Sequence, residues 1–414
     1  MVLKTLWNNF GELQKSPLFK YWVKKKAISL PNYTTIVKEL KDALQTEGIK
    51  LGPLEFLFFG IYTEGRTPAP YPPYGYHVDY ALHGDDGPMS EAYLQKHAFE
   101  EGVRIAKNVK VELENQIPVE DDSCPTSSWL NMGIDIGIGA TTSLFTGQDC
   151  VWEQTTSYNT EYLMKSIDDL AKIRFSPDNR FVAYELEIWR GMASEYIPGI
   201  PVITHQLRSP LDLANALRGN DIFLDLYDCP EKVDSLLDAC VEATKQYETL
   251  LRNEIPILRD APGGCCGVAL PRPGMMFINC GPIDLIDPAI GLRFNNPFIE
   301  KLAEFAGSLY FHHHSIGFDR APVVGEIEGL TVQEIVQDPN GPKLIDHLES
   351  FVDPSRSRPI HLHIGYPFFD DENSGEEQLR RIIDRLRGGR FIIQVQSESL
   401  KELNRLLDVA RSCV

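Results

Sequence analysis

Short apolar runs recur along this chain, and helical stretches of roughly 10–15 residues separate most of them. The runs are rich in aromatic and β-branched residues, which is typical of strands that are buried on both faces. The predicted strands cover 54–61, 200–206, 275–279, 308–314, 323–327, 359–364 and 390–396.

The clearest helix signals lie in the second half of the chain. The segment 228–252 predicts a long helix, because Pro230 falls in its first turn and its apolar residues form one stripe. Shorter helices are predicted over 211–217, which Gly219 ends, and over 376–387. The second half of the chain therefore alternates strands with helices.

Strands that alternate with helices predict a parallel sheet with both faces covered. Seven such strands favour a closed (β/α)8 TIM barrel with one strand not located. We assign 51–414 to the barrel and 1–50 to an N-terminal helical extension. A long loop rich in Pro, Tyr and Gly, 65–88, is inserted after the first strand. An open doubly wound sheet is the alternative, but no GxGxxG follows the first strand.

Composition narrows the classes of partner. A chain of 414 residues with 43% hydrophobic residues and a net charge of −19 has an ordinary globular composition. The negative charge argues against binding nucleic acid, which needs a basic surface. We expect no signal peptide and no membrane span. The eight cysteines are widely spaced without CxxC, which indicates reduced thiols and a cytoplasmic protein.

In a (β/α)8 barrel the chemistry lies at the carboxyl ends of the strands. The run SLYFHHH ends in three histidines, and strand alternation puts His312 and His314 on one face and His313 on the other. His361 and His363 repeat this spacing on a later strand. The two pairs, with Glu326 or Glu328 nearby, could bind a divalent transition metal. Hydrogen-bonded packing histidines are the ordinary alternative.

Other candidates follow from position. His205 ends a predicted strand, and Cys265 with Cys266 lies on a glycine-rich turn, where a packing role is the simpler interpretation. Residues of the long loop are candidates for a substrate-binding lid, with packing as the alternative; they include Tyr62, Arg66, Tyr74, Tyr76 and His77.

Two segments carry a family resemblance. The run SPLDLANALRGNDIFLDLYDCPEKVDSLLDACVEATKQY (209–247) resembles the uroporphyrinogen decarboxylase superfamily, and so does INCGPIDLIDPAIGLRFNNPFIEKLAEFAGSLYFHHHSIG (278–317). The resemblance covers about 130–400 and implies a (β/α)8 barrel. It also implies either tetrapyrrole decarboxylation or zinc-assisted methyl transfer between corrinoids and thiols.

The resemblance implies roles for further residues. Asp135 falls near the family's catalytic aspartate, and Asn279 and Cys280 occupy a strand end where the family binds substrate. His314 takes the histidine place of the methyltransferase motif His-x-Cys-Gly, while Ile316 replaces its cysteine. Near the last strand, the place of the third zinc ligand holds Gln394, Gln396, Ser397 or Glu398 instead.

The chain also departs from the decarboxylase branch. Its loop after the first strand has one arginine, Arg66, where that branch has a pair that grips substrate carboxylates.

Three functions remain open. The leading expectation is methyl transfer of the corrinoid-dependent type on an unknown small-molecule substrate, with His312, His314 and Asp135 as catalytic groups. Zn²⁺, held by His312, His314, His361 and His363, and a corrinoid protein are the implied cofactor and partner. Decarboxylation of a tetrapyrrole or other acid without metal is the first alternative, and a binding protein without catalysis is the second.

Overall fold

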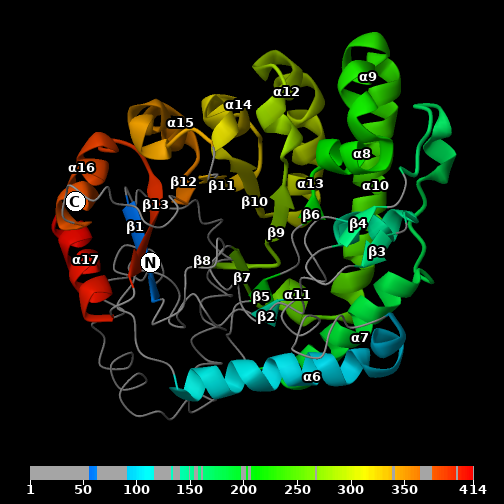
Figure 1. The fold of residues 1–414 in the computed structure, drawn as a ribbon, viewed down its shortest axis with the longest axis horizontal. Helices are drawn as coiled ribbons and strands as arrows, with labels where there is room; N and C mark the ends of the chain where they lie inside the picture. The colour runs from blue at the N-terminus through cyan, green and yellow to red at the C-terminus, as the bar shows by residue number, and fades with distance from the viewer. Residues whose placement is uncertain are drawn as a thin grey trace.

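The computed structural model describes a mixed α/β chain built on a parallel sheet (Figure 1). The described residues are 56–62, 91–115, 132–133, 140–148, 150–152, 157–159, 162–196, 202–203, 207–265, 268–337, 341–363, 375–397 and 400–413. The predicted extension over 1–50 and the loop over 65–88 lie outside these residues.

The strands are β1 (Phe56–Tyr62), β2 (Met132–Gly133), β3 (Cys150–Trp152), β4 (Ser157–Asn159), β5 (Val202–Ile203), β6 (Leu207–Arg208), β7 (Pro262–Cys265), β8 (Val268–Pro273), β9 (Met276–Asn279), β10 (Leu309–His314), β11 (Leu330–Val336), β12 (Ile360–His363) and β13 (Phe391–Ser397). The α-helices are α6 (Glu91–Asn115), α7 (Arg180–Ser194), α8 (Pro210–Arg218), α9 (Ile222–Asp228), α10 (Pro230–Glu254), α11 (Ile257–Asp260), α12 (Pro288–Phe294), α13 (Asn296–Ala306), α14 (Ala321–Gly325), α15 (Val352–Ser357), α16 (Gly375–Arg385) and α17 (Leu400–Ser412). Single 3₁₀ turns include η2 (Asp169–Lys172), η4 (Pro282–Leu285), η5 (Ser315–Arg320) and η7 (Leu348–Phe351).

Seven strands form one sheet in the order β1-β13-β12-β11-β10-β9-β6, and every neighbouring pair in it is parallel. A smaller sheet has the order β2-β5-β7-β8, in which β7 and β8 form an antiparallel hairpin. Strand β5 precedes β6 closely in the chain and pairs with β2. From β9 to β13, strands that follow one another in the chain lie side by side, and β1 lies beside β13. A pairing of β1 with β2 is not among those of the described residues.

Most of the predicted elements are confirmed. The runs over 54–61, 275–279, 308–314, 359–364 and 390–396 form β1, β9, β10, β12 and β13. The run over 200–206 contains the short β5, and the helices predicted over 211–217, 228–252 and 376–387 are α8, α10 and α16.

One predicted strand is wrong. The run over 323–327 does not pair in the sheet; most of it lies in helix α14, which has Pro322 in its first turn. Proline is well suited to that position because it lacks the N–H that a first turn leaves without a partner. The strand is instead β11, LTVQEIV, in which four of the seven residues are β-branched.

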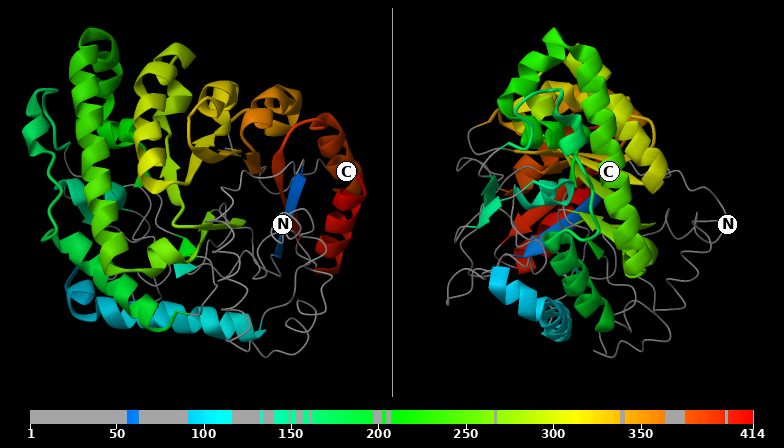
Figure 2. Two further views of the ribbon diagram at one scale, coloured as in Figure 1. Left: turned by 180° about the vertical axis from the view of Figure 1, so that it is seen from behind. Right: turned by 90° about the vertical axis from the view of Figure 1, so that its right-hand side faces the viewer.

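Helices cover the outer face of the sheet. Apolar residues of β10 pack into one core cluster with α8, α10 and α13, and those of β12 and β13 pack into a second cluster with α16 and α17. The last helix, α17, also lies against β1, so the C-terminal segment closes onto the first strand (Figure 2). Figure 1 shows α6 along one edge, against α7.

The crossing of α6 and α7 depends on glycine. A Cβ at Gly102 would lie 1.9 Å from the Ile188 carbonyl oxygen, and one at Gly191 would lie 2.1 Å from that of Phe99. The two backbones therefore touch at a distance that no side chain permits.

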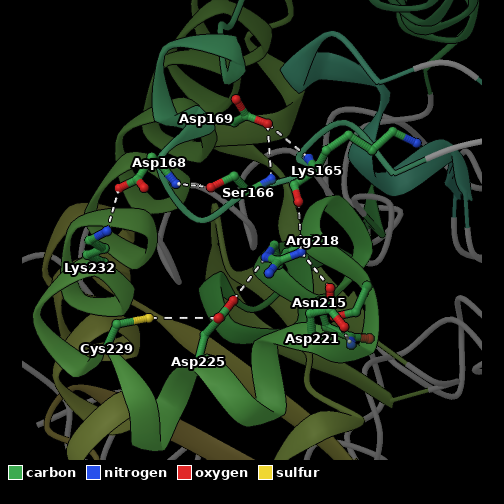
Figure 3. Close-up of polar contacts among 11 residues, drawn as sticks. Lys165, Ser166, Asp168, Asp169, Asn215, Arg218, Asp221, Asp225, Cys229 and Lys232 are labelled. Atoms are coloured by element: carbon green, nitrogen blue, oxygen red, sulfur yellow. Dashed lines mark hydrogen bonds and ion pairs between the residues drawn. The ribbon is translucent and has the colours of Figure 1, made fainter.

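A group of charged residues fixes the segment before α7 to helices α8 to α10 (Figure 3). Arg218, at the end of α8, donates to Asp225 at 2.9 Å and to Asp221 at 2.7 Å. Lys232 of α10 pairs with Asp168 at 2.7 Å. Arg218 and Asp225 are largely buried, so their contact is shielded from solvent and joins α8 firmly to α9.

None of the helices in the described part of the chain combines the length and the apolar character of a membrane span.

Candidate active site

Five neighbouring strands place one polar residue each at the same level of the large sheet. In register, Arg208 pairs with Asn279, Asn279 with His312, His312 with Glu334, and Glu334 with His361. Register partners in a parallel sheet point to the same face. We call Arg208, Asn279, His312, Glu334 and His361 the polar row.

The polar row faces away from the covering helices. Its neighbours along the strands, such as Phe311, Ile335 and Leu362, belong to the helix-packed cores on the opposite face. Arg208 and Asn279 are the last residues of their strands, and His312 lies near the end of β10. The row therefore lies at the carboxyl end of the sheet, where α/β folds place their chemistry.

Glu334 is the centre of the row. Its side chain has no exposed surface, and its two oxygens face two histidines: Oε2 lies 2.8 Å from His312 Nδ1, and Oε1 lies 3.5 Å from His361 Nδ1. The hydroxyl of Tyr310 is also hydrogen-bonded to His361 Nδ1. A carboxylate only accepts, so His312 donates to Glu334 through Nδ1.

His314 lies beside this pair, at the end of β10. Its ring stands nearly perpendicular to that of His312, with 5.0 Å between the ring centroids, and its side chain is partly exposed. Burial raises the pKa of Asp212, while the charges of Arg208 and His314 oppose that rise. Arg208 donates to Asp212 at 2.8 Å, so the row continues into a buried ion pair on α8.

The alternation predicted for the histidine triplet is confirmed. His312 and His314 lie together on the polar-row face. His313 has no exposed surface and lies on the other face, where its ring nitrogens contact Asp284 and Gln333.

The acidic partner predicted from sequence is wrong. Glu326 and Glu328 are both exposed at the solvent end of the α14–β11 connection, whereas Glu334 lies between His312 and His361. The sequence prediction misses Glu334 because it places a strand over 323–327 and none over 330–336. The β-branched residues of LTVQEIV, followed closely by the residue types Asp, Pro, Asn and Gly at 338–341, are the signal that marks this strand.

Asn279 and Cys280, at the end of β9, have different surroundings. Asn279 belongs to the polar row, and within the described part of the chain no donor lies within hydrogen-bonding distance of its Oδ1. Cys280 is fully buried and donates to Asn295 Oδ1 at 3.4 Å. Burial raises the pKa of its thiol. Substrate binding by Cys280 stays a prediction.

Several predicted site residues cannot be placed. Asp135, His205, Arg66, Tyr76 and His77 lie outside the described residues. The strands contain Tyr62, Gln396 and His363, but the side chains of these three lie outside the description.

No three His, Cys, Asp or Glu side chains in the described part of the chain lie together as a metal-binding group. Structural and catalytic zinc sites use at least three protein ligands. The described side chains therefore supply no complete ligand set, and zinc binding by His312, His314, His361 and His363 stays a prediction.

No family profile and no curated protein matches this chain. Among solved structures it is similar to a methyltransferase from Methanosarcina mazei, with 12% sequence identity and a TM-score of 0.49. The match covers 76% of this chain and 86% of that chain. This likeness is too distant to indicate a substrate or a reaction.

Proposed function

We propose that this chain is an enzyme that decarboxylates a small organic acid at the carboxyl end of its sheet, with His312 as the proton donor. The contact between His312 Nδ1 and the buried carboxylate of Glu334, at 2.8 Å, supports this proposal. A histidine oriented by a carboxylate is suited to general acid–base catalysis.

The negative charge of Glu334 would make His312 a better proton donor. A buried carboxylate favours the protonated form of a neighbouring imidazole, which is the form that a general acid needs. When the bond to the leaving carboxylate breaks, CO₂ departs and the electron pair stays on carbon. That carbon takes the proton from His312 Nε2, and water restores the proton to the ring. His361 contacts the other oxygen of Glu334 and would help to hold it.

Methyl transfer of the corrinoid-dependent type is the second candidate. A carboxylate that accepts from Nδ1 is also the usual outer partner of a metal-binding histidine. His312 meets Glu334 in this way, while His361 Nδ1 lies 3.5 Å from the other oxygen of the same carboxylate. In this reading His312, His314, His361 and His363 would hold Zn²⁺, which would activate a thiol acceptor, and a corrinoid protein would be the partner. It stands second because the described side chains supply no complete ligand set.

Mass spectrometry separates the candidates. Protein expressed with added zinc is incubated in D₂O with a panel of small organic acids, and its metal content is measured. We expect a product that has lost CO₂ and gained one deuterium on carbon. A His312→Ala variant should lose about 10²–10⁴-fold in rate.

Other outcomes would overturn this proposal. About one zinc ion per chain, lost in a His312→Ala, His314→Ala variant, together with methyl transfer from methylcobalamin to a thiol, would put methyl transfer first. Tight binding of an acid without turnover would indicate a binding protein.

We also infer that the sheet closes into a (β/α)8 barrel. Counting β5 with β6 and β7 with β9 as one strand each, every parallel strand from β2 to β13 neighbours the next one in the chain, and β1 lies beside β13. Only a contact between β1 and β2 is needed for closure. We place the protein in the cytoplasm, as its cysteine spacing predicts.

A further inference from the structure

The middle histidine of the triplet belongs to a second polar chain, on the face of β10 opposite the polar row. Asp284 of η4 is buried, and its Oδ1 lies 2.9 Å from His313 Nδ1. The other ring nitrogen, Nε2, lies 2.8 Å from the amide nitrogen of Gln333 on β11. We call Asp284, His313 and Gln333 the back clamp.

The hydrogen-bonding roles in the back clamp follow from its chemistry. The amide nitrogen of Gln333 can only donate, so His313 Nε2 accepts. The carboxylate of Asp284 can only accept, so His313 Nδ1 donates. Both ring nitrogens of His313 are therefore occupied, Nδ1 by Asp284 and Nε2 by Gln333. It has no nitrogen left for a substrate.

Asp284 is also hydrogen-bonded to the backbone of the histidine triplet. Its second oxygen, Oδ2, accepts from the backbone N–H of His314 at 2.9 Å. The chain then returns past it, because a Cβ at Gly317 would lie 2.0 Å from Asp284 Oδ1. Only glycine fits this approach. One carboxylate therefore holds two consecutive residues of the strand end and touches the turn that follows.

The back clamp lies next to the hydrogen-bonded pair of His312 and Glu334, on the same two strands. His312 precedes His313 on β10, and Glu334 follows Gln333 on β11. A hydrogen bond between the two strands on the rear face therefore limits how far His312 and Glu334 can move apart on the front face.

We propose that Asp284 is a positioning residue that acts through His313, Gln333 and the His314 N–H to hold His312 in line with Glu334. This rests on the acid–base role proposed for His312. His312 and His313 would then face opposite sides of one strand, His312 toward Glu334 and His313 toward Asp284.

Nitrogen NMR of the histidine rings tests this without a substrate. Long-range ¹H–¹⁵N spectra are recorded for the wild type, Asp284→Asn and Gln333→Met, with His347→Gln as the control. His347 stacks on Phe318 of η5 at 3.9 Å between centroids, so the control disturbs the same turn without touching the back clamp.

We expect the His312 Nδ1 proton to exchange with water at least about tenfold faster in Asp284→Asn, because the ring is held less firmly against Glu334. The control should leave this exchange rate unchanged. Gln333→Met cuts only the far end of the back clamp and should give a smaller change in the same direction. It serves as the test if Asp284→Asn does not fold.

Altered His313 signals with an unchanged His312 ring would overturn the positioning role. That result leaves the proposed reaction standing if decarboxylation is observed. Conversely, a shifted His312 ring in a protein that decarboxylates nothing would support the back clamp and remove the proposed function.

Discussion

At the scale of single residues, three consecutive histidines have three different surroundings. His312 donates to a buried carboxylate, His313 has both ring nitrogens occupied, and His314 is partly exposed beside Asp212. Side-chain type alone does not separate these roles. Strand alternation separates His313 from the other two, but only the neighbouring strands show which carboxylate each ring meets.

Replacing Glu334 tests the catalytic pair directly. Glu334→Gln removes the buried negative charge next to His312, so the ring should titrate at lower pH than in the wild type. Histidine NMR titration measures this. The exposed Glu328→Gln is the matched control and should leave the titration of His312 unchanged. An unaltered His312 in Glu334→Gln would show that the carboxylate does not set its charge.

Thiol reactivity tests the burial of two cysteines. Burial raises the pKa of Cys240 and of Cys280, so both should be largely protonated and hidden from reagents near neutral pH. We expect iodoacetamide to label the partly exposed Cys413 first, as followed by peptide mass spectrometry. Labelling in denaturant, where all three should react, is the control. Rapid labelling of Cys280 in the folded protein would place it in an open site.

At the scale of elements, the sequence predicts the order of the sheet well and one connection poorly. The apolar runs at β1, β9, β10, β12 and β13 are short and rich in aromatic and β-branched residues, so each is recognisable alone. The run over 323–327 is equally apolar, but Pro322 begins a helix there. Because β11 was missed for this reason, Glu334 was missed with it.

Some contacts between helices depend on a few ion pairs. Arg218 and Asp225 are only 11% and 13% exposed, so Arg218→Ala leaves a carboxylate in a shielded place without its cation. We expect a loss of about 1–3 kcal/mol in the free energy of unfolding. Urea denaturation measures it. Arg356→Ala breaks an exposed pair with Asp353 and should cost about 0–1 kcal/mol. Equal losses of unfolding free energy in the two variants would show that burial does not strengthen the contact between Arg218 and Asp225.

A second ion pair, between Arg385 and Glu349, makes the stability of the fold depend on pH. The hydrogen bond from Arg385 of α16 lowers the pKa of Glu349 in η7 from 4.5 to about 2. A lowered folded-state pKa stabilises the fold above pH 4.5, and this contribution is lost as the pH falls toward 2. Wild type should therefore lose its advantage over Glu349→Gln across that range. Parallel acid-unfolding curves for the two proteins would show that the contact with Arg385 does not stabilise the fold.

At the scale of the whole molecule, the strong negative charge predicts its behaviour toward polyanions. With a net charge of −19, the chain should not bind DNA or RNA even at low salt, where phosphate contacts are strongest. Fluorescence anisotropy with labelled duplex DNA and single-stranded RNA checks this, with a basic protein as the positive control. Binding that weakens steeply with salt would reveal a basic surface.

The polar row also has a meaning for protein engineering. Each of its five positions stands on a separate strand, and the residues on either side of it are buried against helices and fix the backbone. A position can therefore be exchanged while its neighbours keep their places. The row is a linear array of positions, among which His312, Glu334 and His361 contact one another. A saturation library over all five codons would therefore sample combinations of acid, base and cation together on one backbone.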